Sequence, residues 1–274
     1  MTIVAQNLRY LKARLKSMHL ALCRRLGLVF PNNVAKNEAN SDSGWRARHP
    51  QLDRAARIAA VSLVVFLVAP YVFVLLYRFI DPPFSSLMLQ QALTGVSIDR
   101  RWMNIEDMSK NLPEAIIVSE DSAFCEHWGV DWRAVEEAIE DAENGDIPRG
   151  ASTITMQTAK NMFLWPEQTY LRKALEVPLA YWITAVWPKW RVAEIYLNIA
   201  EWGPGIFGAE AAARRHFGKS AADLSQSEAL LLAAALPNPI RNNAAKPGPR
   251  LRNRAARLRS RVSREKSAAG CVFG

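Results

Sequence analysis

The chain has 274 residues, of which 50% are hydrophobic and 22% are charged, so it can form one ordinary domain with a substantial core plus flanking segments. Its net charge of +9 comes from the two ends: residues 1–57 carry 11 Lys/Arg against 3 Asp/Glu, and residues 241–274 carry 10 against 1, whereas residues 58–240 have a net charge of −8. This distribution excludes a uniformly basic domain and leaves two partners for the basic ends, nucleic acid or an anionic membrane surface.

An uncharged run of 20 residues, 58–77, predicts a transmembrane helix and favours the membrane. At about 1.5 Å per residue the run spans roughly 30 Å, the thickness of a bilayer core. Pro70 inside the run is tolerated in a membrane helix. A buried helix of a soluble protein is the alternative. A cleaved signal peptide is disfavoured, because a long segment precedes the run and no small-residue cleavage site follows it.

The charges beside this run predict its orientation. Arg54 and Arg57 adjoin its start and Arg46 and Arg48 lie close by, whereas Arg78 alone lies near its end. By the positive-inside rule, residues 1–57 are expected in the cytoplasm and the chain after the run outside it.

Helices dominate the elements predicted after the run, so the expected fold class is mostly α. Some strand-like content is expected around residues 96–98. The predicted helices run from Pro113 to about Ser119, from the N-cap Asp131 to a stop at Gly145, from just after Ser152 to about Phe163, over 171–186 with an interruption at Pro178, from Pro188 to about Ile199, and over 229–233 behind a capping box formed by Ser225 and Glu228.

The cysteines and the C-terminal tail complete the pattern. Of the three cysteines, Cys23, Cys125 and Cys271, the first would be cytoplasmic, so no disulfide framework is expected. From about residue 248 the chain is rich in arginine and poor in apolar residues. A solvated charge run is expected there, with attraction to a membrane surface as the alternative.

Residues 120–129 are the first of four clusters that could carry chemistry. They crowd Glu120, Asp121 and His127 against Phe124 and Trp128, directly after an apolar run. A carboxylate beside apolar surface has a raised pKa, which suits a general acid or base near neutral pH. Acidic residues at a helix end are also common solvated caps, so these ten residues alone favour neither interpretation.

Residues 150–161 form the second cluster, a small-residue turn that opens a helix. Backbone N–H groups exposed at such a turn can hold an anion. Ser152 and Thr153 add hydroxyls, and Gln157 and Lys160 share a helix face. An ordinary Ser/Thr cap with a solvated lysine explains the same residues.

The third and fourth clusters are equally open to two interpretations. Arg172 and Glu176 are spaced as a surface salt bridge worth under about 1 kcal/mol, or with Lys173 as a cationic clamp for a diphosphate plus a second carboxylate. Glu194 and Asn198 share one helical face, which a structural hydrogen bond would explain as well as a binding role.

Together, the order and spacing of the four clusters resemble the peptidoglycan glycosyltransferase family, the family 51 transglycosylases, over roughly residues 95–240. The matching positions are Glu120, Asp121, Phe124, His127 and Gly129, then residues 150–157, then Arg172, Lys173 and Glu176, and finally Glu194, Tyr196, Leu197 and Asn198. Met156 departs from the family, because it replaces the first of a usual pair of glutamines. The chain has no room for a fused transpeptidase domain and looks like the monofunctional form, and we attribute the S-x-x-K match at Ser263 to chance.

The resemblance implies a lysozyme-like, bilobal, mostly α domain behind a single N-terminal transmembrane helix. We expect a basic cytoplasmic segment (1–57), a transmembrane helix (58–79), a connector (80–94), a glycosyltransferase domain (95–240) and a basic C-terminal tail (241–274). The implied location is the bacterial inner membrane, with the N-terminus cytoplasmic and the catalytic domain periplasmic.

The implied reaction polymerises lipid II into glycan strands by inverting β-1,4 transfer, with release of undecaprenyl diphosphate. Glu120 (general base) and Glu176 are then catalytic; Ser152, Thr153, Gln157, Lys160, Arg172, Lys173 and Asn198 bind substrate or diphosphate; Asp121, Phe124, His127, Glu194 and Tyr196 support the site.

The partners implied are lipid II, the growing lipid-linked glycan and the membrane, with cell-wall synthesis and division proteins as candidates and no nucleic acid. A divalent cation, Mg²⁺ or Mn²⁺, is expected beside the diphosphate, with Glu176 as a candidate ligand and no organic cofactor. The alternatives are a membrane-anchored, lysozyme-like hydrolase of the same polymer and a non-catalytic scaffold for wall synthesis. The hydrolase would not need the Arg172–Lys173 clamp, and for the scaffold Glu120→Gln would leave the cellular effect intact.

Overall fold

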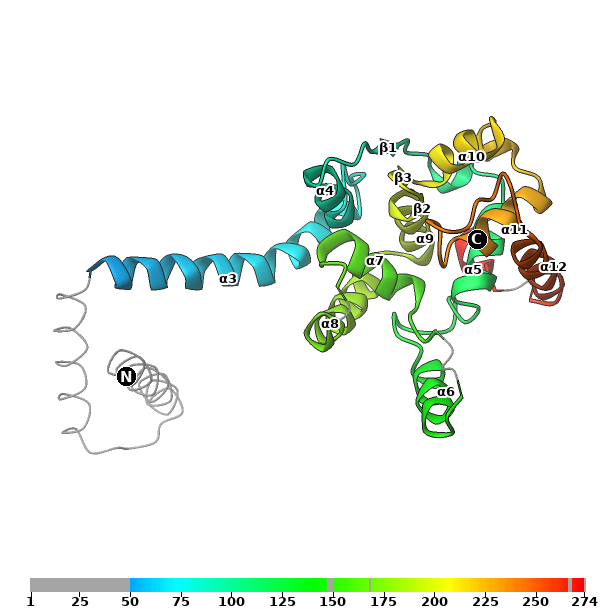
Figure 1. Ribbon diagram of the computed structural model, residues 1–274. Coiled ribbons are helices and arrows are strands. Elements are labelled where there is room, and N and C mark those ends of the chain that lie inside the picture. Colours follow the sequence, from blue (N-terminus) through cyan, green and yellow to red (C-terminus); the bar gives the residue numbers. More distant parts are fainter. Residues whose placement is uncertain (1–49, 147–149, 168, 266–267, 274) are drawn as a thin grey trace. The chain divides into compact units, whose positions relative to one another are not determined.

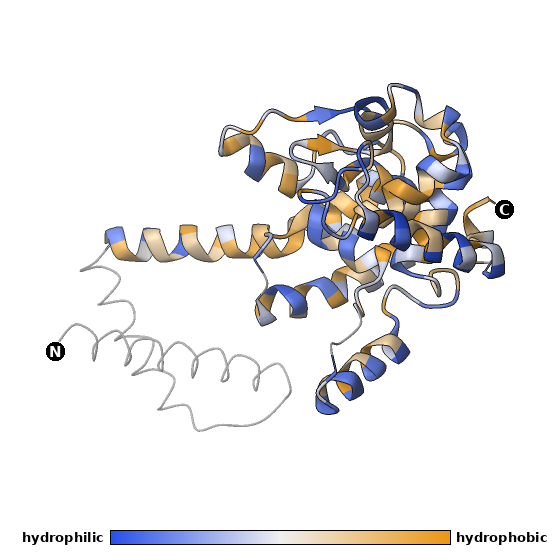
Figure 2. Ribbon diagram, turned by 45° about the vertical axis from the view of Figure 1, so that its right-hand side comes forward, coloured by the Kyte–Doolittle hydropathy of each residue, from blue (hydrophilic) through white to orange (hydrophobic). Residues whose placement is uncertain are grey.

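The computed structural model describes residues 50–146, 150–167, 169–265 and 268–273, and the chain divides into two compact units, residues 1–67 and 68–274 (Figure 1). Helix α3 (Pro50–Tyr77) contains one stretch, Arg54–Tyr77, that is long and apolar enough to cross a membrane. Figure 2 shows this helix as almost continuously hydrophobic. Its apolar side chains are largely exposed, including Val61, Val65 and Phe66. An exposed apolar surface of this length is unfavourable in water, as expected of a membrane helix.

The second unit is built mostly of helices, so the predicted fold class is confirmed. Its helices are α4 (Ser86–Leu93), α5 (Asn111–Glu120), α6 (Trp132–Glu143), α7 (Ile154–Phe163), α8 (Tyr170–Val186), α9 (Lys189–Ile199), α10 (Ala209–Phe217), α11 (Gln226–Ala235), α12 (Pro249–Arg264) and α13 (Gly270–Phe273), with short 3₁₀ turns η1 (Ile105–Asp107) and η2 (Ala221–Asp223). Helix α9 is buried along most of its length and packs against α7, α8 and α10. The core of the domain therefore surrounds α9.

A small sheet closes one side of this core. Strand β3 (Ile206–Phe207) lies between β1 (Asp99–Arg100) and β2 (Glu201–Gly203), parallel to the first and antiparallel to the second. Phe207 is fully buried, so the sheet joins the helical core through β3. Strand β1 begins just after residues 96–98, where strand content was expected.

The end of α3 lies within the second unit, where its backbone carbonyls accept hydrogen bonds from side chains of α8 and α9. Trp182 Nε1 donates to the Tyr71 carbonyl at 3.0 Å, and Arg191 Nε donates to the Tyr77 carbonyl at 3.0 Å. The Val74 side chain is fully buried beneath these contacts. The C-terminal turns of the candidate membrane helix are thus part of the folded domain.

Two predicted helix starts are confirmed by their capping geometry. The Asp131 carboxylate accepts from the N–H groups of Arg133 and Ala134 at the start of α6. Ser225 and Glu228 form the expected capping box at the start of α11. A side-chain acceptor at these positions satisfies N–H groups that have no partner within the helix.

The interruption predicted at Pro178 is wrong, because α8 continues through it. A proline removes one N–H···O bond and crowds the preceding turn. Here the turns on both sides are held by packing against α7 and α9, so the helix continues despite the missing bond.

The solvated charge run predicted from residue 248 is also wrong for α12. Leu251, Ala255, Leu258 and Val262 are all buried, and the helix packs against α5 and α11. These four residues recur at helical spacing and form one apolar stripe. Arginines stand between the four members of this stripe in the sequence, so the overall composition of the segment does not reveal the stripe.

A disulfide joins Cys125 to Cys271, contrary to the expectation that no such bond forms. The bond links the loop after α5 to α13 across 146 residues of sequence. The expectation relied on Cys23, which lies outside the described residues. The two remaining cysteines both follow the candidate membrane helix, so they lie on the same side of it and can pair.

Candidate active site

Glu120 is the last residue of α5, a helix whose preceding turns are buried in the core. Its Oε2 accepts from Gln157 Nε2 at 3.3 Å, and its Oε1 accepts from Ser119 Oγ at 3.3 Å. Burial raises the pKa of Glu120 above its ordinary value, and this effect exceeds the opposing effects of Gln157, Arg254 and Ser119. A raised pKa lies closer to neutral pH, so the carboxylate accepts a proton more readily, which is the property a general base needs.

The amide of Gln157 is oriented by a buried tyrosine. Tyr196 Oη donates to Gln157 Oε1 at 2.9 Å, which leaves the Gln157 amide nitrogen pointing at Glu120 and at the Ser152 carbonyl, 3.4 Å away. Burial, with Glu120 and Asp121 nearby, raises the pKa of Tyr196 well above its ordinary value, so its hydroxyl stays protonated. Tyr196 therefore supports Glu120 through Gln157.

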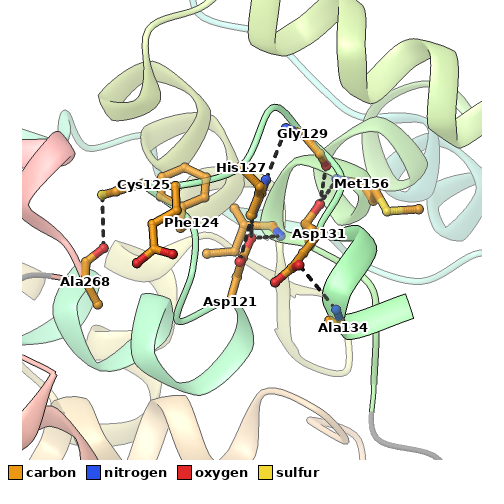
Figure 3. Close-up of polar contacts among 12 residues, drawn as sticks. Asp121, Phe124, Cys125, His127, Gly129, Asp131, Ala134, Met156 and Ala268 are labelled. Carbon is orange, nitrogen blue, oxygen red and sulfur yellow. Dashed lines mark hydrogen bonds and ion pairs between the residues drawn. The ribbon is translucent and has the colours of Figure 1, made fainter. Parts of the chain in front are cut away.

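Asp121 and His127 form a closed network beside Glu120, shown in Figure 3. The Asp121 carboxylate accepts from His127 Nε2 at 2.9 Å and from the Ile154 N–H at 2.9 Å, in the first turn of α7. The Gly129 N–H donates to His127 Nδ1 at 3.1 Å, so the proton of the neutral ring is on Nε2. Both ring nitrogens of His127 are therefore occupied by hydrogen bonds within the protein.

Gly129 is required at its position by conformation and by space. Its φ of +91° lies in the region that favours glycine, and a Cβ there would lie 2.6 Å from the Ala180 carbonyl oxygen. The Thr153 hydroxyl donates to the Gly129 carbonyl at 2.6 Å and accepts from the Met156 N–H. The loop after α5 is thereby fixed to the start of α7.

Lys189 is a site residue that the sequence reasoning missed. Its Nζ donates to the carbonyls of Phe124 (2.5 Å) and His127 (2.7 Å) and lies 4.5 Å from the Phe124 ring centroid. Burial lowers the pKa of Lys189 to about 8. A lysine in the first turn of a helix is opposed by the helix dipole, and this unfavourable position was the available signal of a specific partner.

Helices α7 and α8 line a cavity of about 580 Å³ next to Glu120. Its lining includes Ser152, Gln157, Lys160, Thr169, Tyr170, Arg172, Lys173 and Glu176. Lys173 Nζ donates to Ser152 Oγ and to Glu176 Oε2, each at 3.0 Å, while Arg172 forms an ion pair with Glu176. The lining thus contains three cations, Lys160, Arg172 and Lys173, but one carboxylate, so the cavity favours an anion.

The lysines of the cavity show this excess of positive charge. Burial, then Arg172 and Lys160, lowers the pKa of Lys173 to about 8. Burial and Arg172 likewise lower the pKa of Lys160. A bound anion would reverse these shifts, because an opposite charge favours the protonated amine.

Comparison with known proteins agrees with this geometry. A family model described as "Transglycosylase" matches residues 88–263. The chain is 49% identical to a protein of Nitrobacter winogradskyi, and the match covers 81% of the chain and 97% of that protein. It is 51% identical to a protein of Rhodospirillum centenum, with 82% of the chain and 97% of that protein covered. Each of these relatives is named biosynthetic peptidoglycan transglycosylase. The chain belongs to the transglycosylase family. The transglycosylase domain is lysozyme-like, in agreement with the predicted fold class.

Six of the predicted site residues of this transglycosylase line the cavity: Ser152, Gln157, Lys160, Arg172, Lys173 and Glu176. Gln157 lines the cavity and also contacts Glu120, so it connects the carboxylate to the cations. Asp121, Phe124, His127 and Tyr196 support this arrangement from outside the cavity.

Three predicted residues hold the fold elsewhere. Asn198 is fully buried: its amide donates to the carbonyls of Met103 and Glu194 and accepts from the Met103 N–H. Glu194 accepts from the Ile105 N–H at 2.8 Å and pairs with Arg191. Thr153 caps α7 with both of its hydrogen bonds internal. The hydrogen bonds of Asn198 and Thr153 fit the structural alternative, and their contact with substrate stays a prediction.

Met156 lies in the core and away from the cavity lining. It is buried with Val130 and Ala180, and Val135 and Val177 pack against this group. A glutamine at this position would need polar partners that these neighbours do not offer. Methionine therefore suits the position, and Gln157 alone supplies the amide beside Glu120.

The described residues do not form a resident metal site. Among them no group of three His, Cys, Asp or Glu side chains could hold a metal ion. Glu176, the predicted ligand, is already paired with Arg172 and Lys173. Mg²⁺ and Mn²⁺ prefer several oxygen ligands, and a single carboxylate between two cations does not supply them.

Proposed function

We propose that this transglycosylase is a peptidoglycan glycosyltransferase that polymerises lipid II, with Glu120 as the general base. The observation that carries the proposal is the position of Gln157, which hydrogen-bonds the Glu120 carboxylate and lines the cationic cavity. A proton acceptor and an anion site next to each other are what glycosyl transfer from a diphosphate requires.

The reaction would proceed in one displacement. Glu120 takes the proton of the acceptor 4-hydroxyl while that oxygen attacks C1 of the donor sugar. The bond between C1 and the diphosphate oxygen breaks, and its electron pair leaves with the undecaprenyl diphosphate. A single displacement converts the α linkage of the donor into the β linkage of the product.

The cavity would stabilise the leaving group. Lys160, Arg172 and Lys173 supply positive charge, and the Ser152 hydroxyl supplies a neutral donor. Charge that develops on the diphosphate in the transition state is stabilised by groups already held in place, which costs little reorganisation. Glu176 would hold Arg172 and Lys173 in position.

A divalent cation remains a separate proposal. Because the described residues offer no resident site, Mg²⁺ or Mn²⁺ would enter with the diphosphate oxygens as its main ligands, and Glu176, which lines the cavity, would add one more. Titrating the metal in the presence and absence of lipid II tests this: binding should depend on lipid II.

We further propose that the chain is anchored in the inner membrane with its catalytic domain periplasmic. The apolar helix α3 and the arginines before it support this orientation. The disulfide between Cys125 and Cys271 supports it as well, because disulfides persist in oxidising compartments. Protease treatment of spheroplasts should cleave the catalytic domain and spare the N-terminal segment. Partner proteins of wall synthesis and division remain a proposal from the family resemblance alone.

Incubation of the purified chain with lipid II tests the activity. The expected products are long glycan strands and released undecaprenyl diphosphate. Shortening of pre-made glycan without polymerisation would indicate a hydrolase instead, and no reaction with either substrate would indicate a scaffold.

A further inference from the structure

Helix α12 carries an unusual row of arginines that the activity proposed above does not use. The helix contains seven arginines and no acidic residue. At about 100° per residue, five of them fall within a sector of about 80° along one side of the buried stripe. These five are Arg250, Arg254, Arg257, Arg261 and Arg264, and we call them the arginine row. Arg252 and Arg259 lie on the other side of the stripe.

The fold does not explain this row. Arg261 pairs with Glu265. In the part of the chain that the structure describes, Arg250, Arg254 and Arg257 are exposed and form no ion pair. Like charges three or four residues apart on a helix are destabilising. An arrangement that costs stability and leaves Arg250, Arg254 and Arg257 without an ion pair among the described residues points to an external anion.

The row lies beside the proposed catalytic base. Helix α12 packs against α5, whose last residue is Glu120, and Figure 1 shows α12 next to α5 and α11 and away from α7 and α8. The positive charge of Arg254 favours the ionised form of Glu120 and so opposes the rise in its pKa. Arg254, a member of the row, is thus the arginine of α12 whose charge acts on Glu120. The cationic cavity and the arginine row therefore approach Glu120 from different helices.

Two anionic substrates must meet at Glu120 in the proposed reaction. The leaving diphosphate of the donor occupies the cavity between α7 and α8. The acceptor places its hydroxyl at Glu120, and its own anions, the carboxylates of its peptide and its diphosphate, lie further along the molecule. The row extends about 16 Å from Arg250 to Arg261, long enough to follow such a molecule away from the base.

We propose that the arginine row on α12 is an acceptor-binding surface, which holds the anionic groups of the incoming lipid II while its hydroxyl reaches Glu120. The inference rests on the proposed function and assigns it a second anion site. Arginine suits this task because its planar guanidinium binds carboxylates and phosphates through paired hydrogen bonds.

The test measures acceptor binding separately from donor binding. The full chain in neutral detergent elongates a pre-made lipid-linked oligomer, and labelled lipid II is varied as the acceptor. For the triple variant R250Q/R254Q/R257Q, the KM for the acceptor should rise about tenfold, with kcat changed less than about twofold above the acidic limb of the pH profile. R252Q is the matched control, because Arg252 is an exposed arginine on the other side of the same helix. It should behave like the wild type. The variant R250Q/R254K/R257Q should recover part of the binding, and no variant should melt below the wild-type temperature.

Further arms identify the anion and the alternatives. The same assay with a lipid-linked disaccharide that lacks the peptide identifies the anion that the row binds. If the wild type and the triple variant then have the same acceptor KM, the row binds the peptide carboxylates. If their KM values still differ, the row binds the diphosphate. A triple variant with the same acceptor KM as R252Q would overturn the proposal. So would a defect that occurs only in vesicles of anionic lipid, because the row would then serve the membrane surface. If the wild type itself does not polymerise lipid II, the proposed function fails instead.

Discussion

Tyr196→Phe is the sharpest perturbation of the proposed site, because it removes one hydroxyl and keeps the buried ring. Tyr196 is 2% exposed, and its hydroxyl makes the 2.9 Å bond that orients Gln157. Without the Tyr196 hydroxyl, Gln157 Oε1 loses its hydrogen-bond donor, and the Gln157 amide is free to rotate away from Glu120. Leaving a buried acceptor unsatisfied costs about 1–3 kcal/mol. If 1–2 kcal/mol of that is lost in the transition state, kcat falls about 5- to 30-fold.

The pH profile gives a second, independent readout for this variant. The hydrogen bond from Gln157 lowers the pKa of Glu120, so its loss should raise that pKa further. Because the base works in its ionised form, the acidic limb of the kcat profile should move to higher pH. The assay is lipid II polymerisation followed across pH. Tyr181→Phe is the control, because Tyr181 is 39% exposed and its hydroxyl bonds only Trp132 among the described contacts. An unchanged kcat and an unmoved acidic limb in Tyr196→Phe would refute the role of Gln157 in holding Glu120.

Three further predictions concern charge and stability. Because burial and neighbouring cations lower the pKa of Lys173 to about 8 in the free enzyme, kcat/KM for lipid II should fall as pH rises through 8. Lys173→Arg, which stays charged, should move this alkaline limb upward, and an unmoved limb would assign it to another group. Asp121→Asn should lower the free energy of unfolding by about 1–3 kcal/mol, measured in urea, because the amide cannot accept both the His127 and the backbone hydrogen bonds; an unchanged midpoint would contradict that. Cys271→Ser should lower the melting temperature to that of the reduced wild type. A bond across 146 residues lowers the entropy of the unfolded chain, which stabilises the folded state by up to about 5 kcal/mol. Equal melting temperatures of the wild type with and without reductant would show that the bond adds no stability.

Local signals in the sequence predicted local structure well. Asp131 and the Ser225–Glu228 pair mark helix starts because a side-chain oxygen there satisfies backbone N–H groups, which is a matter of a few neighbouring residues. The apolar residues just before Glu120 correctly indicated a raised pKa, although its cause is burial within the folded domain and not α5 alone. Only the two caps have a cause within one turn of the residue concerned.

Long-range contacts were not predictable in the same way. The apolar stripe of α12 becomes meaningful only against α5 and α11, which lie far from it in sequence. The partner of Cys125 is 146 residues away, and no spacing rule identifies it. Met156 could be interpreted only once Val130 and Ala180 were seen around it.

Motif membership also did not separate contact with substrate from structural support. Asn198 and Gln157 both occur in matched motifs and both carry an amide. The first is saturated by Met103 and Glu194, whereas the second faces the cavity. Only the hydrogen-bond partners distinguish them, and these depend on which loop packs over each helix.

The most direct test of the assignment of Glu120 is the rate at which the Glu120→Gln variant polymerises lipid II at near-neutral pH. Glu126→Gln is the matched control, because it changes an exposed carboxylate in the same loop whose described partner is the exposed Arg133. Glu120→Gln should keep its fold and its binding of lipid II but lose about 10²- to 10⁴-fold in rate, whereas Glu126→Gln should stay near the wild type. A Glu120→Gln enzyme that polymerises lipid II at the wild-type rate would contradict the assignment of Glu120 as the base.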